Sequence, residues 1–178
     1  ICFVNKMDRM GADYHGTVES ITDRLQANPV PIQIPVGGEA SFQGVVDLVE
    51  ERAWIYPDDT GQSPQDVPVP PDLVEEVRKY RTLMIEKVAD TDDDLMVKYV
   101  DGREISVDEI RGALRKATID CKIVPVVCGS ALGNRGIQPL LDAVGDYLPS
   151  PKDVPPPVGK DPRTGKEVTC RVDENAPF

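Results

Sequence analysis

The first eight residues, Ile1-Cys2-Phe3-Val4-Asn5-Lys6-Met7-Asp8, join a short apolar run to a polar tetrapeptide. A continuous apolar run of this length is typical of a strand that is buried on both faces of a parallel sheet. The polar residues follow at the carboxyl end of that strand, which is where ligands bind in open α/β sheets. The opening stretch therefore predicts a strand of a parallel sheet with a binding loop directly after it.

A second apolar run, residues 123–128, has the same pattern and also leads into a helix. Apolar residues at three- and four-residue spacing predict helices over 14–26 and about 137–148, one after each strand. Two strand–helix pairs at the two ends of the region 1–148 indicate an α/β fold. Because two parallel strands do not form a stable sheet alone, we expect the rest of this sheet to lie outside the printed sequence.

The middle of the chain has a different pattern, which is typical of a separate α+β insert. Strand-forming segments there cover residues 32–36, 42–49 and 52–56, and a proline-rich loop is expected over 57–71. Helix-start signals, in which an acidic residue follows a capping residue by three positions, then predict three helices. These signals are Asp72 with Glu75, which opens a helix over 72–90, Thr91 with Asp94, and Ser106 with Glu109.

The composition argues against two classes of partner. The 178 residues carry 20 basic and 31 acidic side chains, a formal net charge of -11. Phosphates repel such a surface, so we expect this chain not to wrap nucleic acid. No apolar run approaches the roughly 18 to 20 residues that span a membrane, so no membrane partner is expected. Most of the acidic excess lies in residues 58–101, with twelve acidic and five basic side chains.

The cysteines and the single histidine offer little chemistry. The four cysteines show no C-x-x-C spacing, so no zinc or redox site is predicted, and Cys2 and Cys128 are expected to fill the core. No stretch has the pattern of a secretory signal, so we expect reduced thiols and a cytoplasmic protein. His15 has no Cys or His neighbour in the sequence, and we expect it on the surface near a helix start.

The polar residues Asn5, Lys6 and Asp8 form the N-K-x-D arrangement that recognises guanine. The Asp8 carboxylate is able to accept hydrogen bonds from guanine N1–H and from the exocyclic amine, which adenine does not offer in that geometry. The Asn5 amide either reaches the O6 and N7 edge of the base or braces a neighbouring loop. The aliphatic part of Lys6 covers the ring, with its ammonium toward the ribose oxygen. Three fixed residues are a modest signal, so their context decides.

The second predicted strand supplies that context, because it ends in Ser130, Ala131 and Leu132. Small side chains at this point let backbone N–H groups approach guanine O6, and the Ser130 hydroxyl is available to brace the Asp8 carboxylate. Ser-Ala alone would be an ordinary strand-to-helix turn, but with N-K-x-D at the end of an earlier strand it favours a guanine site. The predicted nucleotide-binding residues are Asn5, Lys6, Asp8, Ser130, Ala131 and Leu132.

These motifs, with the segments around them, resemble the bacterial elongation factor G family of translational GTPases. The similarity rests on four segments, which are Phe3 to Asp13, Ile32 to Gly37, Phe42 to Leu48, and Cys128 to Leu132 with Gly136-Ile137-Gln138. It implies GTP or GDP as the ligand, and in the intact protein a role in ribosomal translocation with the ribosome as partner.

The resemblance also implies a domain organisation. Residues 1–29 and 121–148 would be the C-terminal part of a GTPase domain, whose α/β sheet is of the phosphate-loop type. Residues 30–120 would be the family's inserted α+β subdomain, called G-prime. Residues 149–178 would be a linker toward a β-barrel domain, in keeping with the prolines over 149–162.

The phosphate half of such a site is missing from the printed sequence. It contains no G-x-x-x-x-G-K-[ST] loop, and in this family the Mg²⁺ ligands and switch segments also lie upstream. Two D-x-x-G strings, Asp8 to Gly11 and Asp58 to Gly61, lack the position of a switch. Hydrolysis depends on phosphate and Mg²⁺ electrostatics, so we predict no GTPase activity for this chain alone and millimolar guanine binding at best. The chain also opens on Ile1, and we expect it to be a piece of a larger protein.

Two alternatives stay open. One is a non-enzymatic interaction module, because the acidic region contains helix 72–90 with charged outer positions. By resemblance, that helix would contact the C-terminal domain of the ribosomal stalk protein, although a solvated helix face also explains the charges. The other is a related translational GTPase that shares N-K-x-D, either a ribosome-protection protein or release factor 3. The continuation Arg9 to Asp13 favours elongation factor G.

Overall fold

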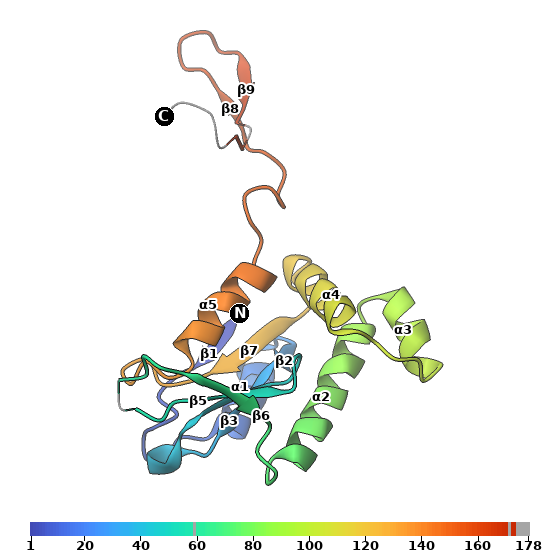
Figure 1. Cartoon of the computed structure of the whole chain (residues 1–178). Coiled ribbons are helices and arrows are strands. Elements are labelled where there is room, and N and C mark those ends of the chain that lie inside the picture. Colours follow the sequence, from blue (N-terminus) through green and yellow to red (C-terminus); the bar gives the residue numbers. More distant parts are fainter. Residues whose placement is uncertain (59, 171, 174–178) are drawn as a thin grey trace. The chain divides into compact units, whose positions relative to one another are not determined.

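The computed structural model describes residues 1–58, 60–170 and 172–173, and Figure 1 shows their arrangement. The chain divides into two compact units after Leu148. The first unit contains a parallel sheet, an antiparallel sheet and the helices α1 to α5. The second unit contains a hairpin of β8 (Val158–Lys160) and β9 (Glu167–Thr169).

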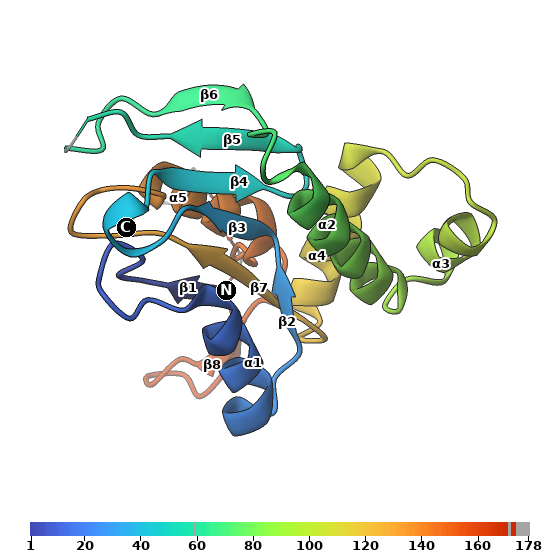
Figure 2. The same cartoon turned by 90° about the horizontal axis from the view of Figure 1, so that it is seen from below.

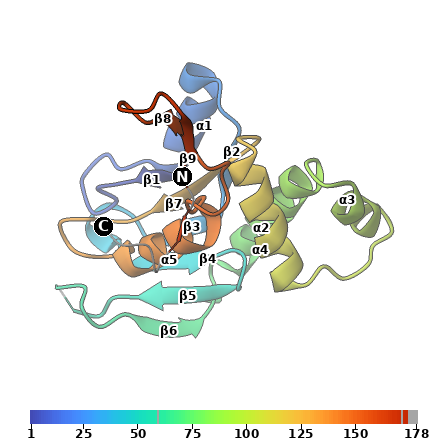
Figure 3. The same cartoon turned by 90° about the horizontal axis from the view of Figure 1, so that it is seen from above.

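The parallel sheet has the strand order β1-β7-β2. Its strands are β1 (Cys2–Val4), β7 (Val124–Cys128) and β2 (Pro29–Pro31). The last three residues of the central strand β7 are fully buried, as the continuous apolar run predicts. Helix α1 (Tyr14–Leu25) follows β1 and α5 (Ile137–Tyr147) follows β7, and the two helices lie on opposite sides of the sheet in Figures 2 and 3. The prediction of an α/β fold is confirmed.

The antiparallel sheet is the strand component of the insert, and its order follows the chain, β3-β4-β5-β6. Its strands are β3 (Gln33–Val36), β4 (Gly44–Asp47), β5 (Arg52–Ile55) and β6 (Gln65–Pro68). β6 lies where a proline-rich loop was predicted, and it forms the outer edge of the sheet, where a proline is tolerated. Arg52 on β5 forms an ion pair with Asp66 on β6, with Nε and Oδ1 2.5 Å apart.

Ile32 joins the two sheets, because β2 runs into β3 across this single residue. Its N–H donates to the carbonyl of Val126 in the parallel sheet at 3.0 Å. Its carbonyl accepts from the N–H of Leu48, directly after β4, at 3.0 Å. The sequence did not predict β2 as a strand of the parallel sheet, and the expected domain boundary between residues 29 and 30 falls inside it.

Three helices complete the insert, namely α2 (Val74–Ala89), α3 (Asp93–Val100) and α4 (Val107–Ile119). The apolar stripe of α2 buries Val77, Met84 and Val88, and α4 buries Ile110 and Leu114. These side chains belong to the same buried cluster as the residues of both sheets. The first unit therefore has one continuous core.

One of the three predicted helix-start signals is confirmed, and two are wrong in their capping residue. Ser106 and Glu109 form a reciprocal capping box at the start of α4. Helix α2 begins after Leu73, which makes no side-chain capping bond, so Asp72 is not the cap. Asp92, rather than Thr91, caps α3 by accepting the N–H of Leu95 at 3.2 Å. The Thr91 hydroxyl instead donates to the carbonyl of Val88, at the end of α2.

His15 links two helices that are far apart in the sequence. Its side chain is about half exposed, and its ring stacks on that of Tyr80 with centroids 5.2 Å apart. Its Nδ1 lies 2.8 Å from the Tyr80 hydroxyl, and its Nε2 lies 3.1 Å from a Glu76 carboxylate oxygen. The lone histidine therefore packs α1 against α2, near the start of α1 as predicted.

The second unit differs from the predicted linker, because it contains the β8–β9 hairpin. The Asp161 carboxylate accepts the N–H groups of Arg163 and Thr164 in the turn, and these bonds lower its pKa. Residues 171 and 174–178 of the predicted linker lie outside the described residues. Within the part of the chain that the structure describes, no helix is long and apolar enough to cross a bilayer.

Candidate nucleotide-binding site

The two predicted motif loops leave the same edge of the parallel sheet. β1 and β7 are adjacent, with Val4 opposite Cys128, so both loops begin side by side. The Gly129 N–H donates to the carbonyl of Val4 at 3.0 Å, and its carbonyl accepts the N–H of Met7 at 3.1 Å. A Cβ on Gly129 would lie only 2.4 Å from the Arg135 carbonyl oxygen, so this position requires glycine. The backbone thus brings N-K-x-D and Ser-Ala together.

Asn5 ties the two loops to one another. Its Oδ1 accepts the N–H of Ala131, in the second loop, at 3.0 Å and the N–H of Lys6 at 2.7 Å. Of the two roles considered for this amide, the structure therefore shows the bracing of a neighbouring loop. Lys6 has a φ of 62°, in the left-handed region that non-glycine residues rarely adopt. The Asn5 carboxamide bond to the Lys6 N–H accompanies this sharp turn after β1.

Asp8 is partly exposed, and its closest ionic neighbour is Arg9, with Nε and Oδ2 3.9 Å apart. The Asp8 carboxylate is therefore partly accessible at this edge of the sheet. On the other loop, Ala131 is exposed and the Leu132 side chain is 83% exposed. Four of the predicted residues, Asn5, Lys6, Ala131 and Leu132, are thus exposed at the sheet edge, with Asp8 partly so.

Ser130 differs from the others because it is almost fully buried. Its hydroxyl accepts the N–H of Gly133 at 3.4 Å, and its backbone exchanges two hydrogen bonds with Arg135 at 2.9 and 3.0 Å. These bonds shape the second loop from within. The contact of Ser130 with the Asp8 carboxylate stays a prediction.

Side chains outside the two predicted motifs also hold these loops. Glu39, in the turn between β3 and β4, bonds the first loop, and Arg135 donates to the carbonyl of Phe42 at 2.8 Å. Asn134 and Gln138 both donate to the carbonyl of Gly61 at 3.0 Å. No periodicity or motif marks these contacts, since each joins a polar side chain to a distant backbone group.

Charged side chains also gather in a hollow away from the two motif loops. A hollow of about 200 Å³ lies between the antiparallel sheet and α5, and its lining includes Asp47, Arg52, Asp66, Arg111 and Asp146. Burial raises the pKa of Asp47, although its carboxylate accepts two backbone N–H groups. Among the described residues, no group of three or more His, Cys, Asp or Glu side chains is arranged to hold a metal ion.

The four cysteines differ in their burial. Cys128 is fully buried, which confirms its predicted place in the core, and burial raises the pKa of its thiol. Cys2 is half-buried, whereas Cys121 and Cys170 are exposed.

Comparison with known proteins agrees with the geometry of the two loops. The sequence profile of a family described as the elongation factor Tu GTP binding domain matches residues 1–150. The chain belongs to this family. Elongation factor Tu GTP-binding domains are guanine-nucleotide sites of translational GTPases, so the coarse prediction of a translational GTPase segment is confirmed.

A crystal structure of a protein from Thermus thermophilus is also similar. The two chains are 28% identical, with a TM-score of 0.74, and the match covers 94% of this chain. It covers 26% of the Thermus chain, so this elongation factor Tu-type segment spans about a quarter of the length of that relative.

Proposed function

We propose that this chain is the guanine-recognition part, with the inserted subdomain, of a longer translational GTPase of the elongation factor G kind, which drives ribosomal translocation in the cytoplasm. The observation that carries the proposal is the bond from the Ala131 N–H to Asn5 Oδ1, which unites N-K-x-D and Ser-Ala at one sheet edge. The 26% coverage of the Thermus chain and the lack of a phosphate loop in the printed sequence support a longer parent protein.

Each motif residue then has a distinct role toward the base. Asp8 accepts from guanine N1–H and the exocyclic amine, and the aliphatic part of Lys6 covers the ring. The exposed backbone at Ala131 and Leu132 offers N–H groups to O6. Asn5 and Ser130 act on the loops, which fixes the spacing between the Asp8 carboxylate and those N–H groups. The phosphates and Mg²⁺ of GTP would be held by other parts of the parent protein.

The same proposal assigns the domains. Residues 1–29 and 121–148 form the C-terminal part of the GTPase domain, and 30–120 form the insert. Residues 149–178 lead toward a following β-barrel domain. Since β2 crosses the first boundary, the insert begins within a strand of the GTPase sheet rather than after a loop.

The test is the substitution Asp8→Asn in the full-length protein that carries this chain. An asparagine reverses the donor and acceptor pattern at the base edge, so guanine nucleotides lose at least about tenfold in affinity and xanthine nucleotides gain. Asp13→Asn is the matched control, because Asp13 caps α1 by accepting the N–H of Gly16 and an asparagine keeps that bond. Competition of GDP and XDP against a fluorescent nucleotide measures the preference, and an unchanged preference in Asp8→Asn would refute the role of Asp8.

A second function is carried by the outer face of α2. Glu75 and Arg78 are 83% and 70% exposed, and they belong to the most acidic region of the chain. We propose this face, within residues 72–90, as the contact for the C-terminal domain of the ribosomal stalk protein. A chemical-shift titration with that domain should move the α2 signals at low salt and lose the effect at high salt. Signals of α2 that stay in place at low salt would favour a solvated face.

A further inference from the structure

Glu39 connects the antiparallel sheet to the first recognition loop. This residue begins the short helical turn Glu39–Ser41 between β3 and β4. Its N–H donates to the carbonyl of Met7 at 2.9 Å, and its Oε1 accepts the N–H of Gly11 at 2.7 Å. Met7 and Gly11 bracket Asp8, so Glu39 fixes the chain on both sides of the residue that selects guanine.

The backbone of Glu39 is shaped for this double contact. Its φ is 52°, in the left-handed region that a non-glycine residue adopts at a cost in free energy. Gly37, two residues earlier, has a φ of 72°, and a Cβ there would lie 2.2 Å from the Ser41 carbonyl oxygen. The turn between β3 and β4 is therefore tight, and it presents the N–H and the carboxylate of Glu39 to the same loop.

The second recognition loop is held by the same sheet. The Gly61 carbonyl, in the connection between β5 and β6, accepts from Asn134 Nδ2 and Gln138 Nε2, both at 3.0 Å. A Cβ on Gly61 would lie 2.4 Å from the Gly133 carbonyl oxygen, so the two backbones are in direct contact. Arg135 adds a bond to the carbonyl of Phe42. The first loop is thus anchored to the turn between β3 and β4, and the second loop to this turn and to the connection between β5 and β6.

We propose that the antiparallel sheet is the positioning scaffold of the guanine site, and that Glu39 is a positioning residue for Asp8. The inference rests on the proposed function, since it concerns how tightly the same site holds its nucleotide. Glu39 acts through Met7 and Gly11, and Asn134 with Gln138 acts through the second loop. Because Glu39 holds the first loop and Asn134 with Gln138 holds the second, loosening either contact alters the spacing between Asp8 and the N–H groups around Ala131. The release rate of the nucleotide therefore depends on the insert.

The first measurement asks whether Glu39 holds the loop. It uses hydrogen–deuterium exchange of peptides over residues 5–12 in the full-length protein that carries this chain, without nucleotide. Glu39→Ala removes the acceptor of the Gly11 N–H, and we expect exchange about 5-fold faster. Glu39→Gln keeps an acceptor oxygen of the same reach and should restore most of the protection. Glu104→Ala, at an exposed glutamate between α3 and α4, is the matched control.

The second measurement asks whether that hold matters for the nucleotide. Release of fluorescent GDP should be about 5-fold faster in Glu39→Ala and in the double variant Asn134→Ala/Gln138→Ala, and near the wild-type rate in Glu39→Gln and Glu104→Ala. Xanthine nucleotide bound to Asp8→Asn should be released faster by the same factor when Glu39→Ala is added, because a positioning residue does not read the base.

The outcomes separate the two proposals. Unchanged exchange over residues 5–12 in Glu39→Ala overturns the positioning role. Faster exchange with an unchanged GDP release rate overturns the link to the nucleotide. A wild-type protein that binds no guanine nucleotide overturns the proposed function, and with it the effect on release, whereas the exchange data still decide whether Glu39 holds the loop.

Discussion

The sheets and the helices of the insert are held in place by different interactions. Both sheets close over one apolar core, in which Phe42 and Ile34 are fully buried. Helices α2 and α4 contribute to that core, but cationic side chains also bind them to backbone carbonyls elsewhere. Lys87 of α2 donates to the carbonyl of Pro29 at 2.8 Å, and Arg115 of α4 donates to that of Asp146 at 2.7 Å.

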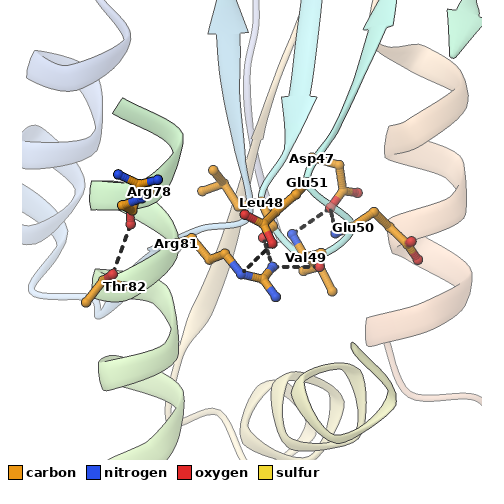
Figure 4. Close-up of polar contacts among 8 residues, drawn as sticks. All are labelled: Asp47, Leu48, Val49, Glu50, Glu51, Arg78, Arg81 and Thr82. Carbon is orange, nitrogen blue, oxygen red and sulfur yellow. Dashed lines mark hydrogen bonds and ion pairs between the residues drawn. The ribbon is translucent and has the colours of Figure 1, made fainter. Parts of the chain in front are cut away.

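Arg81 of α2 also binds backbone carbonyls, and Figure 4 shows its surroundings. Its guanidinium donates to the carbonyls of Leu48 and Val49 in the turn between β4 and β5, and its Nε lies 3.2 Å from the Glu51 carboxylate. A carbonyl carries no removable charge, so such a bond survives changes of pH that break an ion pair. The difference teaches that the helices add polar bonds with distant carbonyls to their apolar contacts, whereas the two sheets share a continuous apolar core.

The largest loss of stability is expected from a substitution in the core that the two sheets share. Phe42→Ala should lower the free energy of unfolding by about 3–5 kcal/mol, through lost burial and the cavity that remains. Because one core serves both sheets, Trp54 fluorescence and the reactivity of the buried Cys128 thiol should report the same shifted midpoint in denaturant. Met10→Ala, at a side chain that is 92% exposed, is the control. Two separate midpoints in the wild-type protein would contradict a single core.

A smaller and more local effect is expected from Arg81→Ala. The substitution leaves the carbonyls of Leu48 and Val49 without this donor, which should cost about 1.5–3 kcal/mol. Arg78→Ala is the matched control one turn earlier, because its ion pair with Glu75 is exposed and such pairs contribute about 0–1 kcal/mol. Amide exchange should increase in α2 and in residues 48–51 while the parallel sheet stays protected. Equal effects of the two substitutions would show that the carbonyl bonds do not hold the helix.

The difference between apolar packing and bonds to distant carbonyls also explains which parts of the structure could be predicted from the sequence. The strands and helices follow from apolar periodicity, which is local, and the two recognition loops follow from motifs at strand ends. The bonds of Arg81 and Glu39 join side chains to backbone groups 28 or more residues away, and no local pattern encodes them. The edge strand β6 was missed because its polar residues and the prolines around it match a loop, and pairing with β5 is what makes it a strand.

The wrong prediction of the residue that caps α3 also has a non-local cause. The pattern of a capping residue and an acidic residue three positions later fits both Thr91 with Asp94 and Ser106 with Glu109. At α4 the reciprocal bonds form. At α3 the Thr91 hydroxyl already donates to the carbonyl of Val88, so the next residue, Asp92, takes the capping position. The end of one helix therefore decides how the next begins, which the local pattern does not contain.

The smallest expected effect concerns a bond between two helices of the insert. The Lys98 ammonium of α3 and the capping bonds to Ser106 lower the pKa of Glu109 from its ordinary 4.5 to about 2. A carboxylate whose pKa is lowered by folding stabilises the protein above its unfolded pKa, and this contribution is lost as the pH falls from about 4.5 to about 2. The free energy of unfolding of Glu109→Gln should therefore fall less steeply than that of the wild type across this window.

The variant Lys98→Gln identifies the cause of that slope. The ammonium is the largest influence on the Glu109 carboxylate, so its removal should flatten the same part of the pH profile in a protein that keeps Glu109. Denaturant titrations at several pH values between about 2 and 5 measure both slopes. Parallel curves for all three proteins would mean that the contact between α3 and α4 contributes nothing to stability. In that case the helices of the insert would depend on their apolar faces and on the carbonyl bonds alone.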